Sequence, residues 1–279
     1  MEQKTRHLLF TFITALLFFF GLGVYATSLL HPYVSAYLSA NIPFFALALG
    51  LILSHSVLLK QPLVDLVTEI KAWSWRLALL AAISYLAVMG LFTVIGAIRY
   101  PHDYHVFHIS LWKRLGFIAM ALIITPIQTT GEEILLRIIP LKLVNRIRSK
   151  VIKALIPALI FTLLHVANRE IAQSQNRLAV LLYYALFGFI PSYIAVRSDR
   201  YEFPLAIHAA NNLFVVLFCN YEHSSLPSLP LFFSTRPIGT WMDTLQLIVA
   251  LAISWRLSQD HSPERNGEER KHRRKDHEL

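Results

Sequence analysis

The sequence predicts an all-α membrane protein: a polytopic bundle of about eight transmembrane helices that encloses a polar cavity. Three observations lead to this fold class. Of the 279 residues, 55% are hydrophobic and only 15% are charged. The apolar residues form long runs, several of them close to the ~20 residues that a helix needs to cross a bilayer. Within these runs lie a few acidic, basic and imidazole side chains, which are costly at bilayer depth and usually face the interior of a bundle.

The eight predicted spans follow one another with short connections. Lys4 and Arg6 precede the first span as in a signal peptide, but the run is long and more spans follow, so we interpret it as an uncleaved signal anchor. The fourth span is too long for one straight helix across a ~30 Å core, and Pro126 and Gly131 are positions where it could break or kink. The spans are expected at 7–30, 42–59, 75–98, 115–144, 151–167, 178–196, from about 204 onward, and at 240–257.

The spans divide the chain into four regions. Residues 1–114 hold three spans and a polar loop, 115–219 the segment with the polar motifs, 220–257 a loop and the last span, and 258–279 a charged tail that we predict to be disordered. The polar loop carries His102, His105 and His108 at a spacing of three. Because aromatic residues are interspersed with them, we interpret this loop as interfacial rather than as a metal site.

The positive charge is explained by membrane topology. The net charge is +9, and most of the 26 Lys and Arg residues lie in the loops and termini on one side of the predicted bundle. This asymmetry predicts that both termini are cytoplasmic, and the compact form with short loops favours a bacterial inner membrane. A basic stripe within a soluble domain is missing, so we expect no nucleic-acid partner. The single cysteine, Cys219, excludes an internal disulfide and is interpreted as a small apolar filler.

The most costly polar residues to bury are Glu132, Glu133 and Arg137 in the fourth span. In a helix, residues four apart share a face, so Glu133 can pair with Arg137 while Glu132 points about 100° away. One carboxylate is then neutralised, and the other is free to act as a general base. The alternative is a buried ion-pair network that holds two helices in register.

Two further spans carry polar pairs at helical spacing. His165 follows Phe161 by four residues, and Asn212 follows His208 by four, with Asn211 beside it. In an antiparallel hairpin with its turn near residues 148–149, Glu132 and His165 would lie at matching depth. His208 is close to the start of its span, so either that helix starts below the surface or a loop re-enters the membrane. A single histidine is commonly an interhelical hydrogen bonder, but the combination predicts one shared site.

The three motifs, in this order on successive apolar segments, resemble those of the CPBP family of intramembrane endopeptidases, also called the CAAX protease and bacteriocin-processing (Abi) family. The matching residues are Glu132-Glu133-x-x-x-Arg137, Phe161-x-x-x-His165 and His208-x-x-x-Asn212. The resemblance covers roughly 115–218. It departs from the family pattern at Leu136 and Ile138, where members often have an aromatic residue and a glycine.

The resemblance implies that 115–219 is the catalytic core of an endopeptidase that acts on membrane-associated proteins, lipidated proteins or peptides. Glu132 would activate a water as general base, and His165 would hold that water. The resemblance also implies that His208 and Asn212 donate to the oxyanion of the tetrahedral intermediate. Supporting roles would fall to Glu133, Arg137, Phe161 and Asn211.

We expect no cofactor. The alternative is zinc, for which Glu132, His165 and His208 could supply ligands. The metal-free mechanism is favoured because the chain has no His-Glu-x-x-His motif and because an arginine next to the site disfavours a cation.

A non-catalytic alternative is also open. The same polar residues could belong to a membrane scaffold, or to a small transporter that binds a solute or relays protons. Transporters often show paired halves with matching interrupted helices, and no such symmetry is evident here. Mutation of Glu132 separates the readings, because only a protease would lose the processing of a peptide.

Overall fold

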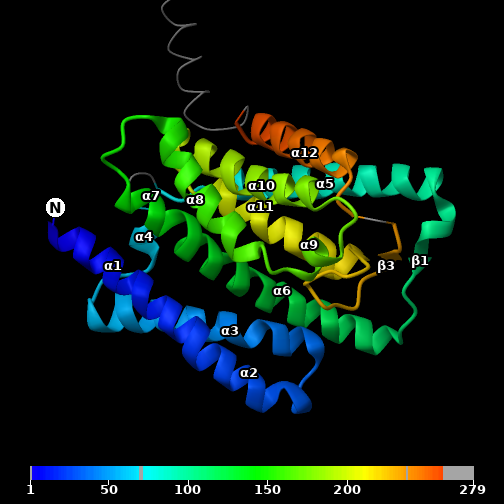
Figure 1. The fold of residues 1–279 in the computed structure, drawn as a ribbon, viewed down its shortest axis with the longest axis horizontal. Helices are drawn as coiled ribbons and strands as arrows, with labels where there is room; N and C mark the ends of the chain where they lie inside the picture. The colour runs from blue at the N-terminus through cyan, green and yellow to red at the C-terminus, as the bar shows by residue number, and fades with distance from the viewer. Residues whose placement is uncertain (1, 69–71, 237, 260–279) are drawn as a thin grey trace, which may run out of the picture.

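The structure, a computed structural model, describes residues 2–68, 72–236 and 238–259. Within these residues the predicted all-α bundle is confirmed (Figure 1). The helices are α1 (Glu2–Leu17), α2 (Val24–Leu30), α3 (Ala36–Leu51), α4 (Val64–Thr68), α5 (Trp75–Arg99), α6 (Leu111–Glu133), α7 (Ile139–Leu143), α8 (Lys150–His165), α9 (Arg169–Gln173), α10 (Arg177–Ser198), α11 (Glu202–Leu213) and α12 (Trp241–Gln259). π-Helical segments at Phe18–Gly23, Ile52–Leu58, Ile134–Ile138 and Phe214–Phe218 extend some of them, and 3₁₀ turns lie at His31–Tyr33 and Pro101–Asp103.

Five helical stretches among the described residues are long and apolar enough to cross a membrane, which supports a multi-pass membrane protein. They are Glu2–Tyr33, Ala36–Leu58, Trp75–Arg99, Leu111–Leu143 and Arg177–Ser198. The other three predicted spans are also helical, as α8, α11 and α12, but they do not meet the same criteria of length and composition. The predicted count of eight spans is therefore not confirmed.

The fourth span is one continuous helical stretch from Leu111 to Leu143. Neither Pro126 nor Gly131 ends it, and its irregular part is the π-helical segment Ile134–Ile138, just after the glutamate pair. Segments of this kind are frequent at functional sites. At the other end of the chain, α12 continues to Gln259, and residues 260–279, for which we predict disorder, lie outside the described part.

The helices pack in a layered arrangement with α6, α8, α10 and α11 in the middle. Figure 1 shows α1, α2 and α3 along one side of the molecule and α5 and α12 along the opposite side. The most extensive contacts are those of α8 with α10 and of α5 with both α11 and α12. Helices α8 and α10 approach closely at Gly188, where an added Cβ would lie 2.9 Å from the Ala158 Cα. Small residues allow such close backbone contact between membrane helices.

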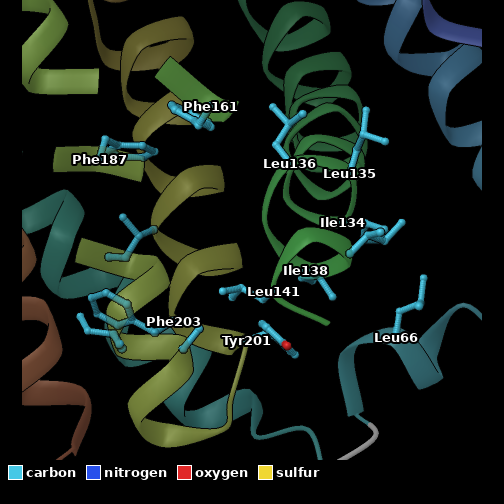
Figure 2. Close-up of a cluster of buried hydrophobic side chains, with 14 of the residues drawn as sticks. Leu66, Ile134, Leu135, Leu136, Ile138, Leu141, Phe161, Phe187, Tyr201 and Phe203 are labelled. Atoms are coloured by element: carbon cyan, nitrogen blue, oxygen red, sulfur yellow. The ribbon is translucent and has the colours of Figure 1, made fainter. Parts of the chain in front are cut away.

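The main apolar core lies around the π-helical segment that follows the glutamate pair. Ile134, Leu135, Leu136 and Ile138 are all buried there. Figure 2 shows these side chains in one cluster with Phe161 and Phe187, which come from α8 and α10. This packing fixes the rotation of the helical stretch Leu111–Leu143, which we call the motif helix. It therefore also fixes the direction in which the Glu132 and Glu133 carboxylates point.

A small sheet was not predicted. Its three strands, β1 (Tyr104–Val106), β2 (Cys219–Tyr221) and β3 (Phe232–Ser234), are ordered β1-β3-β2, with β3 antiparallel to β1 and parallel to β2. Each has only three residues and lies in a connection between helices. Because β1 and β3 lie more than 100 residues apart in the chain, no local sequence pattern predicts their pairing.

Candidate active site

Glu133 and Arg137 form a buried ion pair one helical turn apart. Their exposed fractions are only 1% and 2%. Arg137 also bonds to α10, because its Nε donates to Ser192 Oγ at 2.9 Å and its Nη2 donates to the Phe187 carbonyl at 3.2 Å. The ion pair therefore joins the motif helix to α10. Holding two helices in register is the role that the sequence analysis gives as the alternative to catalysis.

His208 lies between the two glutamates. Its Nδ1 is 2.8 Å from Glu133 Oε1, and its Nε2 is 3.4 Å from Glu132 Oε2. An ionised Glu133 can only accept, so Nδ1 carries a proton and Nε2 is the nitrogen that can exchange one with Glu132. Glu133 is thus occupied by Arg137 and His208, whereas His208 is the only polar partner of Glu132 among the described residues.

Glu132 faces a cavity of about 460 Å³ inside the bundle. Glu133 and Arg137 do not line this cavity, so the two carboxylates point to different surroundings, as the helical spacing predicts. Apolar side chains of α1, α3, α5 and the π-helical segment Ile134–Ile138 form part of the wall, and polar groups of β2 and β3 form another part. The other predicted site residues that line it are Phe161, His165, His208, Asn211 and Asn212. A mixed lining of this kind suits a chain with a polar backbone and apolar side chains.

His165 is held by its own helix and by two aromatic rings. Its Nδ1 donates to the Phe161 carbonyl at 2.6 Å, which leaves Nε2 as an acceptor. The imidazole stacks on Phe161 at 4.2 Å and on Tyr184 at 4.9 Å between ring centroids. The Phe161 ring also contacts His208, at 5.7 Å. Phe161 therefore separates the two imidazoles and sets the orientation of His165.

Tyr184 is itself fixed by a buried acidic residue that the sequence analysis missed. The Tyr184 hydroxyl donates to Glu170, which also accepts from Asn168 Nδ2 at 3.1 Å and from the Ser225 backbone N–H at 3.0 Å. Glu170 is 4% exposed and lies in α9, between α8 and α10. Glu170 lies between the predicted spans 151–167 and 178–196, and a carboxylate in a connection between spans gives no signal of burial.

The start of α11 lies inside the bundle. Tyr201, Glu202, Phe203 and Pro204 are all buried, and His208, one turn after Pro204, lies against the glutamate pair. Asn212, one turn further on, accepts at Oδ1 from Asn211 Nδ2 at 3.1 Å, and Tyr85 of α5 donates to Asn211 Oδ1 at 2.9 Å.

The structure brings all eight predicted site residues to one region of the bundle. Six of them line the cavity, and the other two form the ion pair beneath Glu132. The sequence analysis missed Ser192, Tyr184 and Tyr85, which bond to or stack on these residues, and Glu170, which holds Tyr184. Each is a single polar or aromatic residue in a segment without a recognisable motif, and only the packing of separate helices gives it a role.

The candidate zinc ligands are not grouped as a metal site. Glu132 and His208 face each other at 3.4 Å, and among the described residues no three His, Cys, Asp or Glu side chains are placed so that they could hold a metal ion. Among the described residues, no metal site forms around His102, His105 and His108 either.

Comparisons with known proteins agree with the resemblance of the motifs. Residues 112–214 match the family model described as type II CAAX prenyl endopeptidase Rce1-like. The chain is also similar to the uncharacterized protein YyaK of Bacillus subtilis (strain 168), with 29% identity over 225 residues, which is 80% of this chain and 74% of the relative. No solved structure matches the chain significantly.

Proposed function

We propose that this protein, whose residues 112–214 match the model of type II CAAX prenyl endopeptidases, is an intramembrane endopeptidase that hydrolyses peptide bonds with a water activated by Glu132. The observation that carries the proposal is the arrangement of the two carboxylates. One is saturated by Arg137 and His208, and the other faces the cavity with a single imidazole beside it.

Glu132 acts as the general base. A water in the cavity would donate to Glu132 and to the free Nε2 of His165, which orient its lone pair toward the substrate carbonyl carbon. As the water attacks, its proton moves to Glu132 and the carbonyl oxygen becomes an oxyanion. Glu132 then passes the proton to the leaving amine, so the carboxylate is regenerated and the peptide bond is broken with one water consumed.

His208 and Asn212 stabilise the oxyanion. Donors placed where negative charge develops are a large contribution to acyl-transfer catalysis. Asn212 offers its Nδ2, because its Oδ1 already accepts from Asn211. His208 offers Nε2, and because Nδ1–H remains bonded to Glu133, this donation requires a proton on both nitrogens. Glu133 and Arg137 hold the imidazole in this orientation.

The mechanism that we propose uses no metal. It is supported by the position of His208 between two carboxylates and by the buried guanidinium on the adjacent turn, which disfavours a further cation. The zinc alternative with Glu132, His165 and His208 predicts a stoichiometric metal in the purified protein and loss of activity after chelation. The glutamate mechanism predicts neither.

The substrate is a peptide or protein within or at the membrane. We propose that it is membrane-associated, lipidated or a peptide, as the family resemblance implies, and that the mixed lining of the cavity accepts apolar residues next to the cleaved bond. The distribution of Lys and Arg supports an orientation with both termini in the cytoplasm of a bacterial cell.

The test is Glu132→Gln. Glutamine keeps the size and the contact with His208 but cannot take a proton, so cleavage is expected to fall by at least roughly 100-fold while the protein stays folded. Peptides are compared by mass spectrometry between cells with the wild type and cells with the variant, and a peptide that differs becomes the substrate for purified protein. Glu222→Gln, at an exposed position that does not line the cavity, is the matched control. An unchanged peptide profile would favour the non-catalytic alternative.

A further inference from the structure

A fully buried tyrosine from outside the matched segment bonds into the site. Tyr85 lies in α5, 0% exposed, and the family match starts only at residue 112. Its hydroxyl donates to Asn211 Oδ1 at 2.9 Å. Burying a hydroxyl among apolar side chains is unfavourable unless it is hydrogen-bonded. The bond to Asn211 therefore offsets the cost of burying the Tyr85 hydroxyl.

The hydrogen bonds from Tyr85 to Asn211 and from Asn211 to Asn212 set the direction of the Asn212 amide. An asparagine side chain presents a donor on one side and an acceptor on the other. Because Tyr85 donates to Asn211 Oδ1, the Asn211 Nδ2 is turned toward Asn212 and donates to its Oδ1 at 3.1 Å. The Asn212 Nδ2 is then left without an acceptor anywhere in the described part of the protein.

The direction of the Asn212 amide matters because its two ends have opposite effects on an oxyanion. The NH₂ group would donate to the developing charge, whereas the carbonyl oxygen would repel it. Asn212 lines the cavity and Tyr85 does not, so Tyr85 acts on the reaction through its hydrogen bond to Asn211.

We propose that Tyr85 is a positioning residue, which holds the Asn211 and Asn212 amides so that Asn212 presents its N–H to the oxyanion. This inference rests on the proposed function. It adds a residue of α5 to a site whose other members lie between α6 and α11, and it gives Asn211 a defined role.

The experiment uses the full-length protein and the peptide whose cleavage is lost with Glu132→Gln. Tyr85→Phe keeps the ring and removes the hydroxyl. We expect kcat to fall roughly fivefold to tenfold, the equivalent of one hydrogen bond, with KM unchanged within roughly twofold. Asn211→Ala breaks the same chain one step later and should lower kcat at least as much. The double variant should be no slower than Asn211→Ala alone, because Tyr85 acts through Asn211.

Tyr37→Phe is the matched control. Tyr37 is also a buried tyrosine, its hydroxyl bonds to Thr125 Oγ1 at 2.7 Å, and it does not line the cavity. It should lower the unfolding temperature about as much as Tyr85→Phe does while kcat stays at the wild-type value. This comparison separates a positioning role from a loss of stability.

The possible outcomes decide between the two proposals. If the wild type cleaves the peptide and Glu132→Gln does not, the proposed function holds. In that case an unchanged kcat in Tyr85→Phe, or a double variant slowed by the product of the two single effects, overturns the positioning role alone. If Tyr85→Phe does not fold, an unchanged kcat in Asn211→Ala overturns it. A wild-type protein that cleaves no peptide overturns both.

Discussion

Replacement of Arg137 by methionine is expected to destabilise the protein strongly. The side chains of Arg137 and Glu133 are 3% and 1% exposed, and the substitution leaves the glutamate as a buried charge without its cation. Breaking a buried pair in this way costs about 3–5 kcal/mol. For a protein of this size each kcal/mol lowers the unfolding temperature by roughly 2–4 °C, so a decrease of roughly 6–20 °C is expected.

The double variant Glu133→Gln/Arg137→Met tests the cause. It removes both charges, while the amide oxygen of the introduced glutamine could still accept from His208. Since replacing a whole buried pair by neutral groups is often close to neutral, the double variant should regain at least half of the lost unfolding temperature. Tryptophan fluorescence during heating of the purified protein in detergent measures all variants.

A natural control has the same spacing at the surface. Glu2 and Arg6 also form an ion pair four residues apart in α1, but their side chains are 80% and 74% exposed. Exposed pairs contribute roughly 0–1 kcal/mol, so Arg6→Met should leave the unfolding temperature nearly unchanged. The reasoning is refuted if Arg137→Met unfolds within roughly 2 °C of the wild type, or if the double variant is no more stable than Arg137→Met.

Two further predictions concern other parts of the bundle. Gly188→Ala would put a Cβ 2.9 Å from the Ala158 backbone, so overpacking of α8 against α10 should lower the free energy of unfolding by roughly 1–3 kcal/mol. Gly90→Ala is the control and should cost nothing, because no atom lies within 4 Å of its added Cβ. Equal unfolding temperatures of the two variants would contradict this prediction. Burial raises the pKa of the Cys219 thiol to about 11, so alkylation of the folded protein by iodoacetamide should be slow at neutral pH and accelerate as the pH rises toward that value, because the thiolate is the nucleophile. Mass spectrometry measures this reaction, and rapid labelling at neutral pH would show that the thiol is not buried.

The sequence by itself determined the fold class and the residues of the candidate site. Long apolar runs predict helices directly, because a backbone in lipid must satisfy its own hydrogen bonds. The i, i+4 spacing of Glu133 and Arg137 correctly predicted their ion pair, and the same geometry correctly turned Glu132 to another face. These relations lie within one helix, so local periodicity contains them.

Only the tertiary structure decided how those helices meet. The position of His208 between the glutamates depends on the buried start of α11, and the network of Tyr184 and Glu170 depends on how α9 folds between α8 and α10. The bond from Tyr85 to Asn211 joins residues 126 positions apart. Such contacts result from side-chain packing between distant segments, which the pattern of any one segment does not encode. The irregular segment of the fourth span likewise lies after the glutamate pair, where packing of the apolar core fixes it, and not at Pro126 or Gly131.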